Sequence, residues 1–338
     1  MDATSLSAFR ALLVFVLWAC TFSLAHSSTP TSESVSFRNG EVSLEGTLYL
    51  PAEPGPFPSI VAFHAANGGT RDYHAYLHLV TALPKAGFAV LLFDRRGSGA
   101  SSGDFDTATF MDLAADGIAG VSYLKSRREI DPARIGVFGI SQGGWLAPLA
   151  ATMSPDIAFV VAVSGPGVSP ARQMDYGATY ALSAAGEAAN VIDRALSVRA
   201  IVNDYYRGRA TRTDTERAVE AIRHERWFDK VYLPSSGNLP VDPKHTKWFV
   251  EMDYDPLDAI ARVRVPMAIF FAQTDRWVPV EESIVAVRKA TQSNSTVMIF
   301  RVPGTDHLME TGKPDSGQQT SEQYVKQLLA WLQLVVTK

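Results

Sequence analysis

The stretch from Arg134 to Gly144 reads RIGVFGISQGG and joins a short apolar run to a turn of small residues. The apolar run suits a buried β-strand, and the apolar residues that follow the turn suit a buried helix. Gly139 lies two positions before Ser141 and Gly143 lies two positions after it. Glycine avoids the side-chain clashes of a strained turn. A strand, this Gly-x-Ser-x-Gly turn and a helix in succession are typical of a nucleophile elbow. The stretch therefore predicts Ser141 as a catalytic nucleophile in an α/β protein.

A second stretch matches the same five-residue pattern, from Gly99 to Gly103 around Ser101. It follows its apolar run only after several loop residues, and it leads into Asp104-Phe105-Asp106 with no helix directly after it. Because the elbow needs the strand and the helix on either side, Ser101 is interpreted as a loop residue.

Short apolar runs alternate with longer amphipathic stretches along most of the chain, which indicates buried parallel strands joined by helices. Upstream of them, residues 34–50 alternate in polarity around Asn39-Gly40, which predicts an antiparallel hairpin. The expected fold is a mostly parallel, doubly wound sheet with this hairpin at its N-terminal end. The apolar runs are Ile60–Phe63, Phe88–Phe93, Ile135–Phe138, Phe159–Val163, Met267–Phe271 and Val297–Val302.

The alternation stops over residues 171–255, where the signals are all helical. Apolar residues in Val191–Tyr205 step by three or four, and Thr213-x-x-Glu216 is typical of a capping box at a helix start. We expect a helical cap insertion over the C-terminal edge of the sheet, where ligands bind in this architecture. Helices that only cover the surface are the alternative.

An unaided serine hydroxyl is a weak nucleophile, so a base and an orienting acid must accompany it. Asp275 lies on the loop that follows the run Met267–Phe271, and His307 lies on the loop after Val297–Val302. Of the seven histidines, only His307 follows a late predicted strand in this way. Asp306 is the alternative acid, but neighbouring side chains in an extended loop diverge, which favours Asp275.

As a set, these stretches resemble the α/β-hydrolase superfamily, in particular secreted or periplasmic serine esterases close to dienelactone-hydrolase-like and serine-peptidase-like members. The resemblance runs from about Val35 to the last predicted helix. The stretches that carry it are FHAANGGTRD (63–72), DRRGSGASSG (94–103), GVFGISQGG (136–144), Asp253–Pro256 with 271–279, and GTDHL (304–308).

The resemblance implies an α/β-hydrolase domain over residues 34–338, with Ser141 as nucleophile, Asp275 as triad acid and His307 as base. Dienelactone hydrolases proper carry cysteine where Ser141 stands, which disfavours that activity. The resemblance also implies an oxyanion hole formed by the backbone N–H groups of Gln142 and Ala66. Ala65 stands where the family has glycine, and this leaves Ala65 as an alternative donor.

Several other side chains in these stretches have expected roles. His64 is expected to brace its loop through a hydrogen bond, and Arg95 and Arg96 are expected to form ion pairs within theirs. Aromatic residues of the later part of the chain either line a hydrophobic pocket or pack in a core, and these are Trp227, Trp248 and Trp277.

These residues predict a carboxylesterase-type serine hydrolase that cleaves a small-molecule ester through an acyl-enzyme. A serine peptidase or amidase of the same fold is the alternative, and a noncatalytic binding protein is a remote one. The net charge of −4 gives no electrostatic footprint for nucleic acid. No grouping of His, Asp, Glu or Cys has metal-ligand spacing, so neither a metal nor another cofactor is expected, and the oligomeric state stays open.

The N-terminal region from Arg10 to Ala25 reads RALLVFVLWACTFSLA, a positive charge, an apolar run and then small residues. This layout is typical of a secretory signal peptide over residues 1–25, with cleavage after Ala25 or after Ser27. The run is too short and interrupted for a membrane span, which takes about 20 apolar residues. The sequence therefore predicts a secreted or periplasmic protein, with an uncleaved anchor or a lipid anchor at Cys20 as the alternatives.

Overall fold

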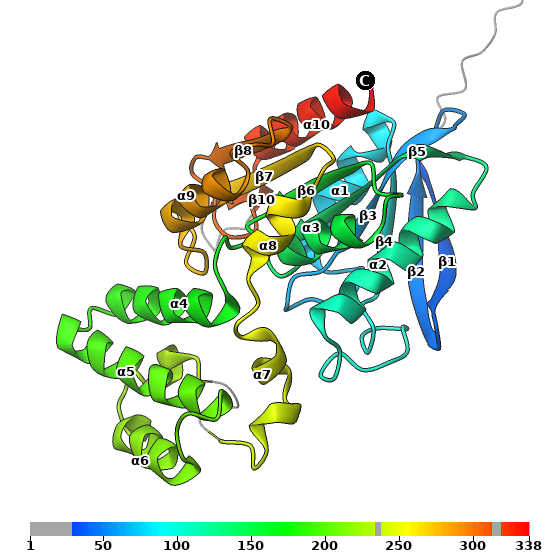
Figure 1. Cartoon of the computed structure of the whole chain (residues 1–338). Coiled ribbons are helices and arrows are strands. Elements are labelled where there is room, and N and C mark those ends of the chain that lie inside the picture. Colours follow the sequence, from blue (N-terminus) through cyan, green and yellow to red (C-terminus); the bar gives the residue numbers. More distant parts are fainter. Residues whose placement is uncertain (1–28, 234–237, 313–318, 338) are drawn as a thin grey trace, which may run out of the picture.

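The computed structural model of the chain describes residues 29–233, 238–312 and 319–337. Eight strands form one sheet in the order β1-β2-β4-β3-β5-β6-β7-β8 (Figure 1). The strands β4, β3 and β5 to β8 run parallel, and β1 and β2 add an antiparallel pair at one edge. The predicted mostly parallel sheet with an N-terminal hairpin is thus confirmed. The strands are β1 Thr31–Asn39, β2 Val42–Leu50, β3 Phe57–Phe63, β4 Ala89–Phe93, β5 Ile130–Ile140, β6 Phe159–Val163, β7 Met267–Ala272 and β8 Val297–Val302.

Helices cover both faces of this sheet, so the sheet is buried between two hydrophobic cores. On one face lie α2 (Phe110–Lys125), α3 (Gly143–Met153), α8 (Pro256–Arg262) and α9 (Val280–Ala290). On the other lie α1 (Leu77–Ala82), flanked by the short helices η1 (His74–Tyr76) and η2 (Pro84–Ala86), and α10 (Glu322–Val336). Every residue of β3, β4, β6 and β7 is buried, which explains why the sequences of these strands are almost entirely apolar.

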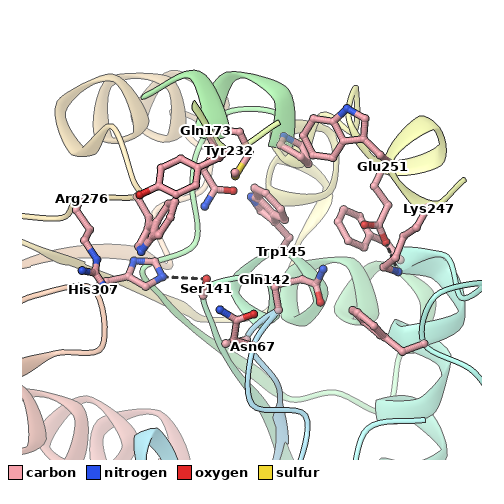
Figure 2. A pocket seen from close by; sticks show the side chains of 18 of the residues that line it. Asn67, Ser141, Gln142, Trp145, Gln173, Tyr232, Lys247, Glu251, Arg276 and His307 are labelled. Carbon is pink, nitrogen blue, oxygen red and sulfur yellow. Dashed lines mark hydrogen bonds and ion pairs between the residues drawn. The ribbon is translucent and has the colours of Figure 1, made fainter. Parts of the chain in front are cut away.

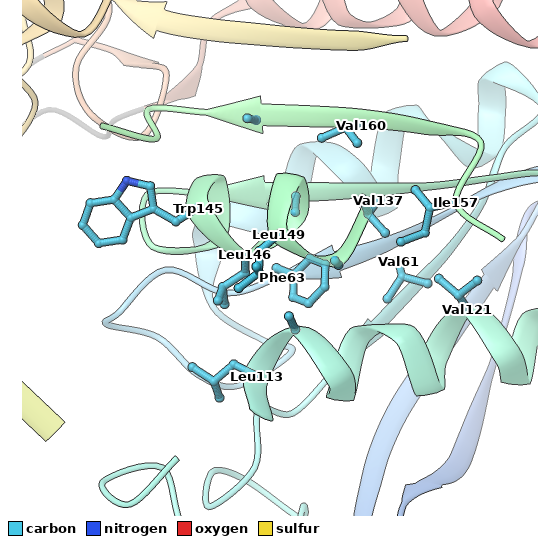
Figure 3. Packing of buried hydrophobic residues seen from close by; sticks show 14 of the residues in the cluster. Val61, Phe63, Leu113, Val121, Val137, Trp145, Leu146, Leu149, Ile157 and Val160 are labelled. Atoms are coloured by element: carbon cyan, nitrogen blue, oxygen red, sulfur yellow. The ribbon is translucent and has the colours of Figure 1, made fainter. Parts of the chain in front are cut away.

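The core on the α2 and α3 side supports the end of β5 from which the functional site is built. Figure 3 shows Phe63 of β3 between residues of both helices, with Leu146 and Leu149 of α3 beside it. A Cβ at Gly117 of α2 would lie 2.1 Å from the Phe63 ring. Glycine at this position therefore lets α2 pack directly against the aromatic ring.

The segment between β6 and α8 is a helical insertion, and its described residues contain no strand. It consists of α4 (Pro170–Ala184), α5 (Ala189–Tyr206), α6 (Arg212–Arg223), the short helices η3 (Phe228–Val231) and η5 (Pro243–His245), and α7 (Lys247–Glu251). These helices lie together to one side of the sheet (Figure 1) and share a hydrophobic core of their own, which includes Val202, Tyr206 and Ile222.

The predicted helix start in this insertion is wrong by two residues. Helix α6 is capped by Thr211, whose Oγ1 accepts the backbone N–H of Asp214 at 3.1 Å. Thr213 and Glu216 both lie inside the helix. Thr211 has the extended backbone that lets a side chain fold back onto the first turn, and a residue already in the helix cannot do this.

The predicted signal peptide and Cys20 lie outside the described residues. Within the part of the chain that the structure describes, no helix has the length and apolar character needed to cross a membrane.

Candidate active site

Ser141 occupies a sharp turn between β5 and α3, where its backbone φ of 57° falls in the left-handed region. The turn is closed tightly by its two glycines. A Cβ at Gly139 would lie 1.8 Å from the carbonyl oxygen of Gly143, and a Cβ at Gly143 would lie 2.6 Å from the carbonyl oxygen of Phe63. The Gly-x-Ser-x-Gly pattern is therefore a steric requirement of this turn, which holds the serine out at the end of its strand.

Ser141, His307 and Asp275 form a continuous chain of hydrogen bonds, and Figure 2 shows the bond between His307 and Ser141. The Oγ of Ser141 lies 2.9 Å from Nε2 of His307, and Nδ1 of His307 lies 2.7 Å from Oδ2 of Asp275. The other carboxylate oxygen of Asp275 accepts the backbone N–H groups of Trp277 at 2.7 Å and Val278 at 3.0 Å. These two bonds fix the buried carboxylate, so the imidazole is held with its second nitrogen facing the hydroxyl.

Asp306, the alternative acid, makes different contacts. Its Oδ1 accepts the backbone N–H groups of Leu308 at 3.0 Å and Glu310 at 2.9 Å. This carboxylate therefore shapes the loop that carries His307, while Asp275 lies against the imidazole itself.

The turn after β3 places two backbone N–H groups in different environments. The N–H of Ala65 donates to the hydroxyl of Tyr76 at 2.9 Å and is therefore already engaged. Ala66 and Gln142 line the same cavity as Ser141, and Gln142 is also the N-cap of α3. The positive end of the α3 dipole thus lies beside the nucleophile. The two predicted alternatives therefore differ, because the N–H of Ala65 is bonded within the fold and Ala66 lies at the cavity wall.

The imidazole of His64 braces this turn, as expected. Its Nδ1 lies 3.2 Å from the carbonyl oxygen of Gly68, and its Nε2 contacts the carbonyl oxygen of Phe93 at the end of β4. Burial lowers the pKa of His64 to about 4, so the ring is neutral at pH 7 and its single N–H donates to one of these two carbonyls. His64 therefore ties the turn to the neighbouring strand without adding a charge.

The neighbouring Arg95 and Arg96 behave differently from each other. Arg96 forms the expected ion pair, with Nη2 2.6 Å from Oδ1 of Asp116. For Arg95 the expectation is wrong, because its guanidinium donates to the carbonyl oxygens of Ala65 and Ala66 instead of to a carboxylate. The chain folds so that the side chain of Arg95 points back under the turn after β3.

Ser101 is held inside its loop, in agreement with the sequence interpretation. Its hydroxyl donates to the carbonyl oxygen of Asp94 at 2.6 Å and accepts the backbone N–H of Glu45 at 2.9 Å. This serine connects the loop to β2 and lies away from the hydrogen-bonded chain at Ser141.

A cavity of about 1650 Å³ opens above Ser141, between the sheet and the helical insertion. Trp248 and Trp277 line it, and the Trp277 ring lies 5.0 Å from that of Tyr232. Trp227 does not line this cavity. It is buried in the core of the insertion, where the chain passes from α6 into η3, so its ring packs on other insertion residues.

Several residues of the cavity wall were not predicted from the sequence. In Figure 2, Asn67 lies beside Ser141 and Gln142, while Gln173 and Tyr232 face the serine from the insertion. Lys247 and Glu251 form an ion pair of 2.6 Å further along the wall. Their spacing of four residues on a helix could have suggested this pair, but only the tertiary fold places it in the cavity.

No group of three or more His, Cys, Asp or Glu side chains within the described ranges is arranged to hold a metal ion. The chemistry that the arrangement offers is that of an oriented serine, a histidine base and backbone N–H donors at the wall of a cavity.

In a comparison with known protein families, residues 58–309 match the family described as serine aminopeptidase, S33. Acyl-coenzyme A thioesterase 1 of Mus musculus is 33% identical over 140 residues, which is 41% of this chain and 31% of the thioesterase. An uncharacterized protein of Mycobacterium tuberculosis is 34% identical over 137 residues, or 40% of this chain and 47% of that protein. The chain thus matches less than half of the length of these curated relatives.

Solved structures share the fold at low sequence identity. The α/β hydrolase GrgF from Penicillium sp. superposes with a TM-score of 0.59 at 16% identity, covering 91% of this chain and 100% of that one. The Pyrococcus furiosus esterase Pf2001 gives a TM-score of 0.58 at 18% identity, covering 91% of each chain. Both likenesses concern the fold alone.

Proposed function

The chain belongs to the serine aminopeptidase S33 family of α/β-hydrolases, and from this premise we propose that it is a serine hydrolase that cleaves carboxylic esters of small molecules through an acyl-enzyme. The observation that carries this proposal is the hydrogen-bonded chain from Asp275 through His307 to Ser141 at the wall of a large cavity. Nucleophile, base and orienting acid at these distances form the arrangement that acyl transfer requires.

In the proposed reaction, His307 takes the hydroxyl proton of Ser141 as Oγ bonds to the ester carbonyl carbon. Asp275 holds the imidazole in the required tautomer, and the N–H groups of Gln142 and Ala66 bind the oxygen that becomes negatively charged. The bond to the alcohol then breaks, and the alcohol leaves with the proton from His307. Water repeats the sequence on the acyl-enzyme and releases the acid. Loss of one oxyanion donor costs about 2.7–4 kcal/mol in such sites.

The identity of the scissile bond is the finer part of the proposal. An ester is favoured because its alcohol leaves more readily than an amine, and the Pyrococcus furiosus protein Pf2001, which shares the fold, is titled as an esterase. The second candidate is an amide or peptide bond, which the description of the family favours. A thioester is the bond that the mouse relative is named for.

The first experiment asks whether Ser141 is the nucleophile. We expect a fluorophosphonate probe to label the protein on Ser141 and to leave Ser141→Ala unlabelled. Ser101→Ala is the matched control, since Ser101 is the serine of the second Gly-x-Ser-x-Gly stretch. Ser101→Ala should be labelled like the unaltered protein. Lack of labelling in the folded, unaltered protein would contradict the proposed mechanism.

The second experiment identifies the bond. Aryl esters of graded chain length, the corresponding aryl thioesters and aminoacyl anilides are compared by kcat/KM at matched leaving-group reactivity. We expect the esters to be cleaved fastest. Faster anilide turnover would assign the protein as a peptidase or amidase, and faster thioester turnover would assign it as a thioesterase.

We also infer that the chain is exported, because residues 1–25 have the layout of a cleavable signal peptide. The mature N-terminus is then His26 or Ser28. N-terminal sequencing of exported protein that returned Met1 or Asp2 would contradict cleavage.

A further inference from the structure

Arg95 follows β4 and sends its guanidinium under the turn that carries Ala66. Its Nη1 donates to the carbonyl oxygen of Ala65 at 3.0 Å and to that of Ala66 at 2.9 Å. The carbonyl of Ala65 and the N–H of Ala66 belong to the same peptide unit. This unit is planar and trans, so its N–H points opposite to its C=O. A bond that fixes the carbonyl of Ala65 therefore also fixes the direction of the Ala66 N–H.

We propose that Arg95 is the positioning residue of the oxyanion hole. It holds the Ala65–Ala66 peptide with its carbonyl toward the guanidinium and its N–H toward the cavity that contains Ser141. This inference rests on the proposed function, in which the Ala66 N–H is one of the two donors to the oxyanion. It adds a residue that touches neither the nucleophile nor the base.

The guanidinium is itself held in place, as a positioning group must be. Its Cζ lies 3.4 Å from the centroid of the Phe105 ring, an arrangement in which cation and ring attract each other. The backbone N–H of Arg95 donates to the carbonyl of Gly69 at 2.8 Å. A Cβ at Gly69 would lie 2.8 Å from Nη2 of Arg95, so glycine leaves room for the guanidinium there. Both ends of the turn are thereby tied to the same residue.

The other contacts of this turn leave the Ala65–Ala66 peptide unheld. The hydroxyl of Tyr76 occupies the N–H of Ala65, and the imidazole of His64 contacts the carbonyls of Gly68 and Phe93. Neither contact acts on the Ala65–Ala66 peptide, which carries the second donor. Rotation of this one peptide would turn its N–H away from the cavity, and the bonds from Arg95 are those that oppose the rotation.

Charge adds to the effect of geometry. Arginine stays protonated in proteins, and its hydrogen bonds here go to two neutral carbonyls. A cation bound to a carbonyl polarises the attached N–H, and hydrogen bonds in such a chain strengthen one another. The buried guanidinium therefore makes the Ala66 N–H a stronger hydrogen-bond donor. The gain in hydrogen-bond strength is larger for a negatively charged oxygen than for a neutral carbonyl oxygen. This preference for the charged, tetrahedral state is the signature by which the role is tested.

The test compares Arg95→Met with Arg95→Lys, since methionine and lysine are similar in length but only lysine carries a charge and donors. We expect Arg95→Met to lower kcat on an activated aryl ester about 10²-fold, near the loss from removing one oxyanion donor. KM should change by less than about threefold, because ground-state binding is untouched. Arg95→Lys should stay within about tenfold of the unaltered protein.

A pair of inhibitors supplies the readout that a merely structural role would not move. The Oγ of Ser141 adds to the carbonyl carbon of an aryl trifluoromethyl ketone and forms a tetrahedral oxyanion. The corresponding aryl alcohol only occupies the cavity. Arg95→Met should weaken the ketone about 10²-fold and the alcohol by less than threefold, in proportion to the loss in kcat. The control is Arg96→Met, which breaks the ion pair with Asp116 and should lower thermal stability without changing the ratio of the two affinities.

The outcomes separate this inference from the proposed function. Equal weakening of both inhibitors, or a loss in Arg95→Lys as large as that in Arg95→Met, would assign Arg95 a structural role and overturn the inference. Unchanged kcat in a folded Arg95→Met that still reacts with fluorophosphonate would overturn it while leaving the proposed function intact. An unaltered protein that fails to react with fluorophosphonate would overturn both. If Arg95→Met does not fold, Arg95→Gln replaces it, with a smaller loss of kcat expected and the same ratio of inhibitor affinities as the criterion.

Discussion

Nε2 of His307 lies 2.9 Å from Oγ of Ser141, although 166 positions separate the two residues in the chain. The parallel sheet brings them together. Ser141 follows β5 and His307 follows β8, and the strands between them, β6 and β7, run in the same direction. The loops that leave these strands therefore meet at one edge of the sheet, where Asp275 from the loop after β7 completes the arrangement.

Replacement of the triad acid tests which aspartate orients the base. We expect Asp275→Asn to keep the fold and to lower kcat roughly 10³–10⁴-fold, because an amide no longer holds the imidazole in the required tautomer. The measurement is kcat on one activated ester, with circular dichroism to verify folding.

Asp306→Asn is the matched control for that change, since Asp306 adjoins the same histidine. Its Oδ1 braces the loop through the backbone N–H groups of Leu308 and Glu310, so we expect a loss of at most about tenfold and a lower melting temperature. A large loss of kcat in Asp306→Asn together with an active Asp275→Asn would show that the triad acid is assigned wrongly.

Two tryptophans of the helical insertion allow a comparison of cavity lining with core packing. Trp248 lines the cavity, so Trp248→Ala should change the preference for acyl chain length more than the rate on a small acetate ester. Trp227 is buried in the core of the insertion, so Trp227→Ala should reduce stability by about 3–5 kcal/mol.

The measurements are kcat/KM on esters of graded length and urea unfolding. The fraction of Trp227→Ala that remains folded should keep the chain-length preference of the unaltered protein. Equal losses on every ester in Trp248→Ala would mean that this ring supports the structure without contacting the acyl chain.

A buried histidine outside the active site should make the protein sensitive to acid. His78 packs against Tyr324 between α1 and α10, and burial lowers its pKa to about 4 from the ordinary value of 6.5. Between these two pH values the unfolded chain binds more protons than the folded one, so the free energy of unfolding falls as the pH drops from 6.5 toward 4. From pH 7.5 to pH 5 this single group accounts for about 2 kcal/mol.

The measurement is urea unfolding at both pH values for the unaltered protein and for His78→Leu. The variant loses the bond to Tyr324 and should be less stable at pH 7.5, but its stability should depend less on pH by about 2 kcal/mol. An identical pH dependence in the two proteins would show that His78 does not titrate in this range. His64, with a pKa of about 4 as well, contributes to the slope in both.

Much of the fold and of the site could be predicted because the information is local. Unbroken apolar runs mark strands that are buried on both faces, and the glycines around Ser141 reflect a turn that admits no side chain. The same local context distinguished Ser141 from Ser101. The placement of Asp275 and His307 after late strands then sufficed to put them at one edge of a parallel sheet.

The sequence by itself thus determined which segments form the strands of the parallel sheet, the nucleophile turn and the two loops that accompany it. Only the tertiary structure decided that Tyr76 occupies the N–H of Ala65, that Arg95 binds two carbonyls instead of a carboxylate, and that Trp227 is buried in the insertion while Trp248 lines the cavity. The reason is physical. A strand or a tight turn is specified by the sterics and hydrophobicity of adjacent residues, whereas the partner of a donor, a cation or a ring is whichever group the packing of distant segments brings within a few ångströms.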